Sequence, residues 1–198
     1  IGLLVLSTPI VRVIFERGAF SAADTAATAA ALQFYALGLL GYSIVRIASP
    51  TFYALGRHRT PVVVSVATVL LNAGLNILLV RAMGYRGLAL GTSIAALFNA
   101  TVLLFLLGRH LEGLEGGRVV ASALRVTIAS ALMGGAAFAV DAWLPLVLPG
   151  DALWLHVVRL AAAIGAALGV LALAAHLLRI REFRDGVAMV TRRLARRP

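Results

Sequence analysis

The apolar residues of this chain occur in long runs, and the lengths of these runs predict membrane-spanning helices. Five runs are complete, at residues 22–55, 61–81, 87–108, 119–144 and 153–178. A helix of about 20 residues is long enough to cross a bilayer, and each run reaches that length. The pattern therefore predicts an all-α, polytopic membrane helix bundle.

The ends of the predicted helices carry recognisable polar signals. Ser21 and Asp24 have the spacing of a capping box at the start of the first span. Thr60 and Pro61 predict an N-cap and a first helical proline at the start of the second. Residues 83–87 predict a tight turn into the third span. The opening stretch "IGLLVLSTPIVRVIF" is too short for a full span, so we expect the chain to begin late in a helix of a longer protein.

Composition agrees with a membrane protein and excludes several function classes. The 198 residues are 61% hydrophobic and 13% charged, whereas soluble domains are about 25% charged. The net charge is +10, but the arginines lie between and after apolar runs, which argues against nucleic-acid binding. The chain has no cysteine, so it forms no disulfide and no thiolate metal site.

The distribution of arginines predicts the orientation in the membrane. With a cytoplasmic C-terminus, eleven arginines lie on that side and four on the other. The tail at 180–198 has apolar residues at helical spacing among arginines and predicts an amphipathic helix on an anionic leaflet; a solvated tail is the alternative. The cytoplasmic arginines would be Arg57, Arg59, Arg109, Arg118, Arg179, Arg181, Arg184, Arg192, Arg193, Arg196 and Arg197, and the others Arg12, Arg17, Arg81 and Arg86.

One arginine lies too deep in its span to reach either surface easily. Arg46 precedes Leu55 by nine residues, about 14 Å along a helix, close to half of the hydrocarbon core. Pro50 follows one turn later and removes the N–H that the Arg46 carbonyl would accept. We therefore expect this turn to face a polar cavity. The alternative is an arginine paired to a carbonyl of a neighbouring helix, with a proline that only packs. The stripe of polar and aromatic residues that contains Arg46 is Tyr35, Tyr42, Arg46, Ser49 and Tyr53.

The second span carries a polar face of its own. Asn72 and Asn76 lie there with Ser65 and Thr68 at steps of three and four. These side chains would either line a wet cavity or hold two helices together by hydrogen bonds. Both interpretations remain open from the sequence.

The remaining spans offer little chemistry. The fourth and fifth are rich in Ala, Leu and Val, and Gly165 and Gly169 form a pattern that allows close helix approach. Arg125 and Arg159 each lie about two turns from a link and can reach it. All eight acidic residues, Asp141 among them, are expected in links, caps or the tail, so no coupling carboxylate is expected in mid-span. No catalytic pair, metal cluster or phosphate loop is visible, and we expect neither an enzyme nor a cofactor.

Longer segments resemble a known family. "IFERGAFSAADTAATAAALQFYALGLL", "VRIASPTFYALGRHRTPV", "NAGLNILLV" and "GYRGLALGTSIAALFNA" are similar to the C-terminal half of the MurJ/MviN lipid II flippases. The resemblance implies a MATE-like fold of the MOP superfamily, with fourteen helices in two six-helix lobes and two additional C-terminal helices. This chain would supply the end of the ninth helix through the fourteenth. Residues 1–110 would hold the C-terminal lobe segment, 111–179 the two additional helices with a lipid-tail groove, and 180–198 the basic tail.

The resemblance also implies a function. We expect a transporter of the bacterial inner membrane that flips an undecaprenyl-linked peptidoglycan precursor by alternating access, acting as a monomer and without nucleic acid. Arg46 falls where the family often has Lys or Arg before a proline, while the family's other cavity arginines lie upstream of Ile1. The alternatives are another MOP-superfamily lipid-oligosaccharide flippase, a drug exporter, or a membrane scaffold that transports nothing. The expected substrate-binding residues are Arg46, Tyr42, Ser49, Tyr53, Asn72 and Asn76.

Overall fold

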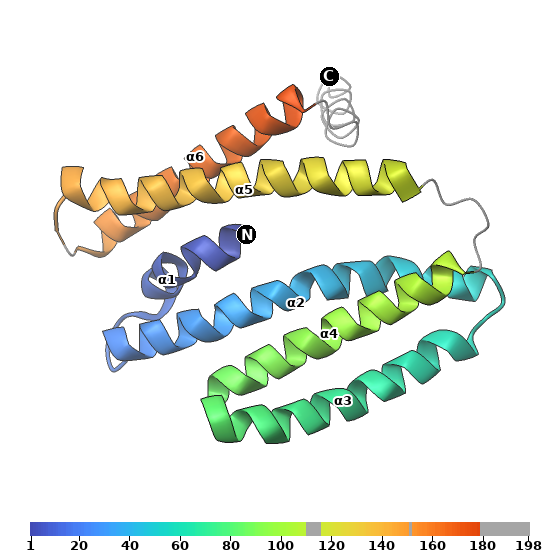
Figure 1. The fold of residues 1–198 in the computed structure, drawn as a ribbon. Helices are drawn as coiled ribbons and strands as arrows, with labels where there is room; N and C mark the ends of the chain where they lie inside the picture. The colour runs from blue at the N-terminus through green and yellow to red at the C-terminus, as the bar shows by residue number, and fades with distance from the viewer. Residues whose placement is uncertain (110–115, 151, 179–198) are drawn as a thin grey trace, which may run out of the picture. The chain divides into compact units, whose positions relative to one another are not determined.

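The structure, a computed structural model, describes residues 1–109, 116–150 and 152–178 and consists there of helices without strands (Figure 1). Five of these helices are long and apolar enough to cross a membrane, which confirms the predicted spans within a few residues. The tail predicted as an amphipathic helix lies outside the described residues. The helices are α1 (Gly2–Phe15), α2 (Ala22–Ala54), α3 (Arg59–Met83), α4 (Tyr85–Gly108), α5 (Gly116–Val147) and α6 (Leu153–Leu177).

The start of α2 is held by side chains of the preceding turn. The backbone N–H of Ser21 donates to the Asp24 carboxylate over 2.9 Å, and the Asp24 N–H donates to the Ser21 hydroxyl over 3.3 Å, which confirms the capping box. The Thr25 hydroxyl is buried and donates to the Glu16 carboxylate over 2.6 Å. Gly18 turns the chain with a φ of 63°. Side-chain hydrogen bonds within the segment that resembles the flippase family most specifically therefore hold the turn at Glu16 to the start of α2.

The start of α3 differs from the prediction. The helix begins at Arg59 after His58, which makes no side-chain capping hydrogen bond, so Thr60 is not the N-cap. Gly56, with a φ of 71°, reverses the chain, and the Thr60 N–H already donates to the Arg57 carbonyl over 3.3 Å. Pro61 then lies in the first helical turn, where its missing N–H would have no partner within the helix. The predicted turn around Gly84, with a φ of 59°, is confirmed.

The chain forms two compact units, of which one holds α2, α3 and α4. In this three-helix unit α4 packs against both α2 and α3, whereas α2 and α3 scarcely contact each other (Figure 1). Small residues make the close approach possible. A Cβ atom added to Gly41 would come within 2.6 Å of the Ala96 backbone, and the buried Ser93 hydroxyl donates to the Phe34 carbonyl over 2.6 Å.

The second unit holds α1 up to Val13 together with α5 and α6. Leu6 packs there with Ala137, Ala163 and Ala167 in one buried cluster. Gly165 and Gly169 do not take part, because an added Cβ at either would have no described atom within 4 Å other than those of the adjacent backbone of α6. The close helix approach predicted at these glycines is made by the alanines on another face of α6, whose methyl groups are nearly as small.

The structure also corrects the placement of one acidic residue. Asp141 lies inside α5, because this helix continues through Pro145 to Val147 instead of ending in a link. The Arg12 guanidinium of α1 lies within electrostatic reach of this carboxylate. A carboxylate therefore lies within a span, near its end, with an opposite charge from the same unit.

Candidate functional site

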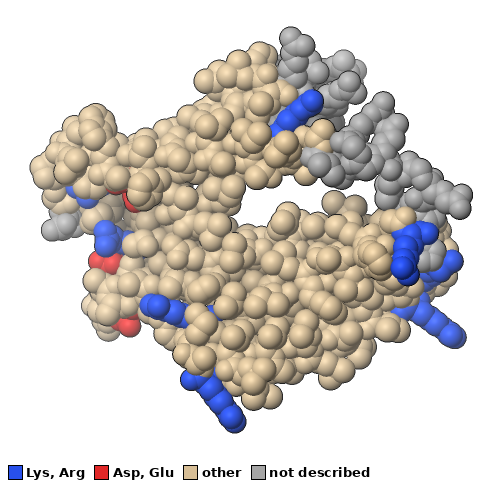
Figure 2. Space-filling model, viewed as in Figure 1, with Lys and Arg blue, Asp and Glu red and all other residues tan. Residues whose placement is uncertain are grey.

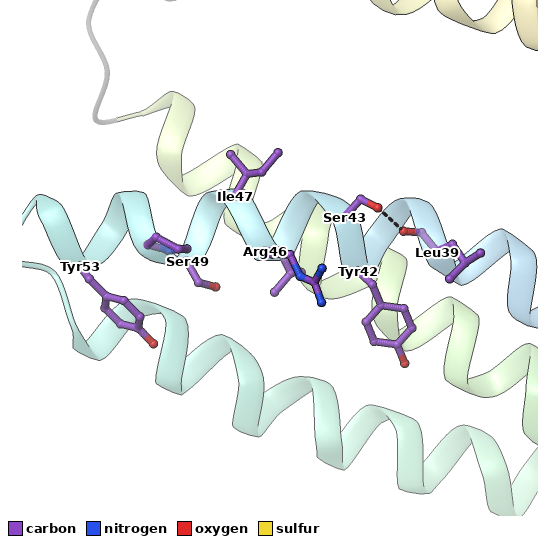
Figure 3. Close-up of a pocket in the computed structure, with 9 residues that line it drawn as sticks. Leu39, Tyr42, Ser43, Arg46, Ile47, Ser49 and Tyr53 are labelled. Carbon is purple, nitrogen blue, oxygen red and sulfur yellow. Dashed lines mark hydrogen bonds between the residues drawn. The ribbon is translucent and has the colours of Figure 1, made fainter. Parts of the chain in front are cut away.

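The residues expected around Arg46 share one face of α2. Figure 3 shows Tyr42, Arg46, Ser49 and Tyr53 pointing to the same side of the helix, while Ile47 points away from it. Arg46 is exposed and Ser49 is half-buried. The two tyrosines expose about half of their surface, 52% for Tyr42 and 46% for Tyr53. The stripe predicted from the sequence is thus a real face of the helix.

This face is concave. It encloses a hollow of about 740 Å³, large enough for a chemical group the size of a sugar or a phosphate ester. The described lining residues all belong to α2, so within the described part of the chain the hollow is an open groove along one helix. The lining residues are Leu39, Tyr42, Ser43, Val45, Arg46, Ile47, Ser49, Pro50 and Tyr53.

The proline lies in the floor of this groove. α2 continues as a helix through Pro50 to Ala54, so the helix is not broken there. The ring nevertheless removes the N–H that the Arg46 carbonyl would accept. The Thr51 hydroxyl donates to the Ile47 carbonyl over 3.0 Å, which gives the next carbonyl an additional partner. Arg46 and an under-satisfied carbonyl therefore occupy the same turn.

The Arg46 guanidinium makes no hydrogen bond and no ion pair with any residue that the structure describes. A guanidinium carries five N–H donors, and placing it in mid-membrane costs about 2.5–3.5 kcal/mol on insertion scales. The alternative interpretation, an arginine paired to a carbonyl of a neighbouring helix, has no counterpart in this part of the chain. The groove thus presents an unpaired positive charge.

A contact that the sequence did not reveal lies at the end of the groove. The Tyr53 ring stacks on the His58 ring with centroids 5.8 Å apart and planes 21° apart. The two residues are separated by the reversal at Gly56, so only the observed turn brings them together. The stack connects the groove to the turn between α2 and α3, which carries Arg57, His58 and Arg59.

The two expected asparagines lie apart from this groove. Asn72 and Asn76 are half-buried on α3, and the side-chain oxygen of each is buried without a hydrogen-bond partner in the described chain. The Asn76 oxygen lies 2.6 Å from the position of an added Cβ on Gly91, so it packs against α4. The structure brings Tyr42, Arg46 and Ser49 together with Tyr53 and leaves the asparagines at the contact between α3 and α4.

Comparison with protein families identifies what this chain is similar to. The family model for the lipid II flippase MurJ matches residues 1–158. The chain is 40% identical over 102 residues to a probable lipid II flippase MurJ of Rickettsia prowazekii, covering 52% of this chain and 20% of that protein. It is 31% identical over 154 residues to a probable lipid II flippase MurJ of Rhizobium tropici, covering 77% of this chain and 29% of that protein.

Comparison with solved structures agrees in fold. The chain matches a lipid II flippase MurJ in an inward closed conformation with a TM-score of 0.66 and 28% sequence identity. The match covers 89% of this chain and 35% of that one. The chain therefore spans between a fifth and about a third of the lengths of these proteins.

Proposed function

This chain belongs to the family of the lipid II flippase MurJ, and we propose that it is the C-terminal part of a transporter that flips an undecaprenyl-linked peptidoglycan precursor. The transporter moves the lipid from the inner to the outer leaflet by alternating access. The family model that matches residues 1–158 supports this function more strongly than any other observation. The five membrane-spanning helices supply a scaffold of the kind that such transport needs. The chain acts by binding and conformational change and catalyses no reaction.

Within this transporter, Arg46 attracts the anionic head of the substrate. The pyrophosphate of such a lipid offers oxygens that a guanidinium binds in a bidentate manner. The exposed, unpaired state of Arg46 in an open groove supports this role. Tyr42, Ser49 and Tyr53 provide hydroxyl groups along the same face for the polar parts of the head.

Asn72 and Asn76 supply further polar contacts in this proposal. Their buried oxygens lack a donor in the described chain, and a substrate hydroxyl or a water molecule would provide one. The contact of Asn76 with Gly91 supports the alternative role, in which the amides hold α3 against α4. In the first role a donor from the substrate or from water binds the amide oxygens. In the second role the amides contact only α3 and α4.

The two C-terminal helices and the orientation complete the proposal. α5 and α6, within the segment 111–179, expose many large apolar side chains and would hold the lipid tail, while 1–110 belongs to the C-terminal lobe. The C-terminus, with the tail 180–198, lies on the cytoplasmic side, as the excess of arginines there supports. The protein acts as a monomer in the bacterial inner membrane.

The competing functions make different demands on the Arg46 groove. A scaffold that transports nothing would pack this face of α2 against protein and leave no volume. The hollow of about 740 Å³ supports a transporter instead. A drug exporter or a lipid-oligosaccharide flippase of the wider superfamily would need a hollow too, but the family match favours the peptidoglycan precursor.

The proposal is tested by replacing Arg46 in the full-length protein. We expect Arg46→Ala to prevent complementation of a flippase-depleted bacterial strain at normal expression, because the positive charge of the groove is lost. Arg46→Lys retains the charge and should restore growth in part, since an ammonium group binds phosphate without the bidentate geometry. Leu40→Ala, at an exposed apolar position of α2 that does not line the groove, is the matched control and should grow normally. Normal growth of the Arg46→Ala strain would contradict the proposed role.

A further inference from the structure

The turn between α2 and α3 gathers basic side chains around a hollow. Arg57, His58 and Arg59 are all exposed. The hollow has a volume of about 410 Å³ and lies at the end of the three-helix unit where α2 meets α3, and Figure 2 shows one of the groups of basic side chains on this face at that end. We call residues 56–60 the basic turn; the hollow is lined by Gly56, Arg57, His58, Arg59 and Thr60.

The backbone fixes the shape of the basic turn. The Gly56 N–H donates to the Tyr53 carbonyl over 3.0 Å, and the Arg57 N–H donates to the Phe52 carbonyl over 2.9 Å. The side chains of Arg57 and Arg59 make no hydrogen bond or ion pair with the described residues. Two arginine side chains therefore line one hollow, and none of their guanidinium donors is used by the described residues.

An apolar surface adjoins these charges. A second hollow, of about 290 Å³, shares His58 and Arg59 with the first and is walled by Val62 and Val63. Both valines lie on the first turn and a half of α3 and are exposed, Val63 by 66%. His58 and Arg59 thus line both a hollow with charged walls and a hollow with apolar walls.

A third arginine lies at the same end of the unit. α4 runs back from the Gly84 turn and ends at Gly108, so Arg109 follows at the end where α2 meets α3 (Figure 1). Its guanidinium lies over the Phe105 ring, 4.6 Å from the centroid. Arg109 therefore adds a third positive charge at the end of the unit that carries the basic turn.

We propose that the basic turn binds the phosphate headgroup of an anionic phospholipid of the surrounding membrane, with an acyl chain lying along Val62 and Val63. The helices on either side of the turn are membrane spans, so the turn lies at the headgroup level of the bilayer. Arginine forks bind phosphate oxygens, and each basic side chain near an anionic surface adds to the attraction. The adjoining valines favour an amphiphile as the ligand, because an acyl chain can contact them and a free phosphate ion cannot.

The test compares two spin-labelled lipids around the full-length protein in phosphatidylcholine vesicles. The measured quantity is the association constant of labelled phosphatidylglycerol relative to labelled phosphatidylcholine, from the motionally restricted part of the electron spin resonance spectrum. We expect Arg57→Gln with Arg59→Gln to lower this ratio by roughly ten- to thirtyfold. The matched control is Arg81→Gln with Arg86→Gln, which removes the same charge around the opposite turn and should lower the ratio much less, because only general surface charge is lost there.

Further arms separate the lipid site from simpler causes. Val63→Ser should lower the association of phosphatidylglycerol, and an excess of inorganic phosphate should not abolish the preference. Loss of the preference on adding inorganic phosphate would overturn the proposal in favour of a phosphate-ion site. If the two double substitutions lowered the ratio equally, the preference would come from general surface charge and the proposed lipid site would be wrong. The single substitution Arg59→Gln, with a smaller expected loss, decides the matter if the double variant does not fold.

Discussion

At the scale of single residues, the arginines of this chain have distinct roles that follow from what surrounds them. Arg46 lacks any partner in the described chain and faces a groove. Arg159, by contrast, donates to the carbonyls of Leu148 and Gly150 in the link after α5, the latter over 2.8 Å. The distance of about two turns predicted that Arg159 can reach this link, and the structure confirms it. Arg159 thus binds carbonyls of its own chain, whereas Arg46 has no such partner among the described residues.

Replacing Arg159 should destabilise the connection between α5 and α6. We expect Arg159→Ala to lower the free energy of unfolding by about 1–3 kcal/mol, because carbonyls at the end of α5 lose a charged donor. Thermal unfolding in detergent measures the effect. Arg125→Ala removes an exposed arginine of the same unit with no partner in the described chain and should change stability by less than about 0.5 kcal/mol. Equal losses in the two variants would exclude this role of Arg159.

At the scale of helices, contact between α2 and α4 depends on glycines that the sequence pattern did not single out. Gly38 and Gly41 lie against Ser93 and Ala96 so closely that an added Cβ would meet backbone atoms. Gly74, in the middle of α3, has no atom of the described residues within 4 Å of an added Cβ. The same residue type therefore serves helix packing at one position and has no packing role at another.

This difference predicts opposite effects on stability when glycine is replaced by alanine at the two positions. Gly41→Ala should destabilise the protein by about 1–3 kcal/mol, because the helices must move apart or distort. Gly74→Ala should leave stability unchanged or raise it by up to about 1 kcal/mol, since alanine favours the helix. Unfolding of the two purified variants in the same detergent provides the comparison. A Gly41→Ala protein as stable as the parent would mean that α2 and α4 are not packed as described.

Some features of the helices can be predicted from the sequence, and others depend on tertiary contacts. The spans, the Ser21 capping box and the Gly84 turn follow from hydropathy and local hydrogen bonding, so the sequence predicts them correctly. The predicted start of α3 was wrong, because the turn at Gly56 places the Thr60 N–H against the Arg57 carbonyl. The predicted position of Asp141 was wrong, because α5 continues through Pro145. The choice of alanines over Gly165 and Gly169 for packing α6 depends on tertiary contacts that no local pattern contains.

At the scale of the whole molecule, the candidate site is partly predictable for a physical reason. The stripe on α2 follows from helical periodicity, and the structure confirms that Tyr42, Arg46, Ser49 and Tyr53 share a face. The stack of Tyr53 on His58 and the hollows of the basic turn require the observed reversal at Gly56 and were not predicted. The role of this face in transport stays a proposal, since the chain spans only a fraction of its relatives' length.

The central claim is that the groove beside Arg46 on α2 meets water during transport, whereas an exposed apolar position of α2 outside the groove meets lipid. Because the chain has no cysteine, single cysteines at Ser49 and Leu40 in an otherwise cysteine-free full-length protein can report on a position inside the groove and a position outside it. We expect a membrane-impermeant thiol reagent, applied to inverted and to right-side-out vesicles of functional variants, to label Ser49→Cys from at least one side. Leu40→Cys, at an apolar position that is 64% exposed and does not line the groove, should resist labelling from both sides because lipid covers it. Protection of Ser49→Cys from both sides, or equal labelling of the two positions, would contradict the account.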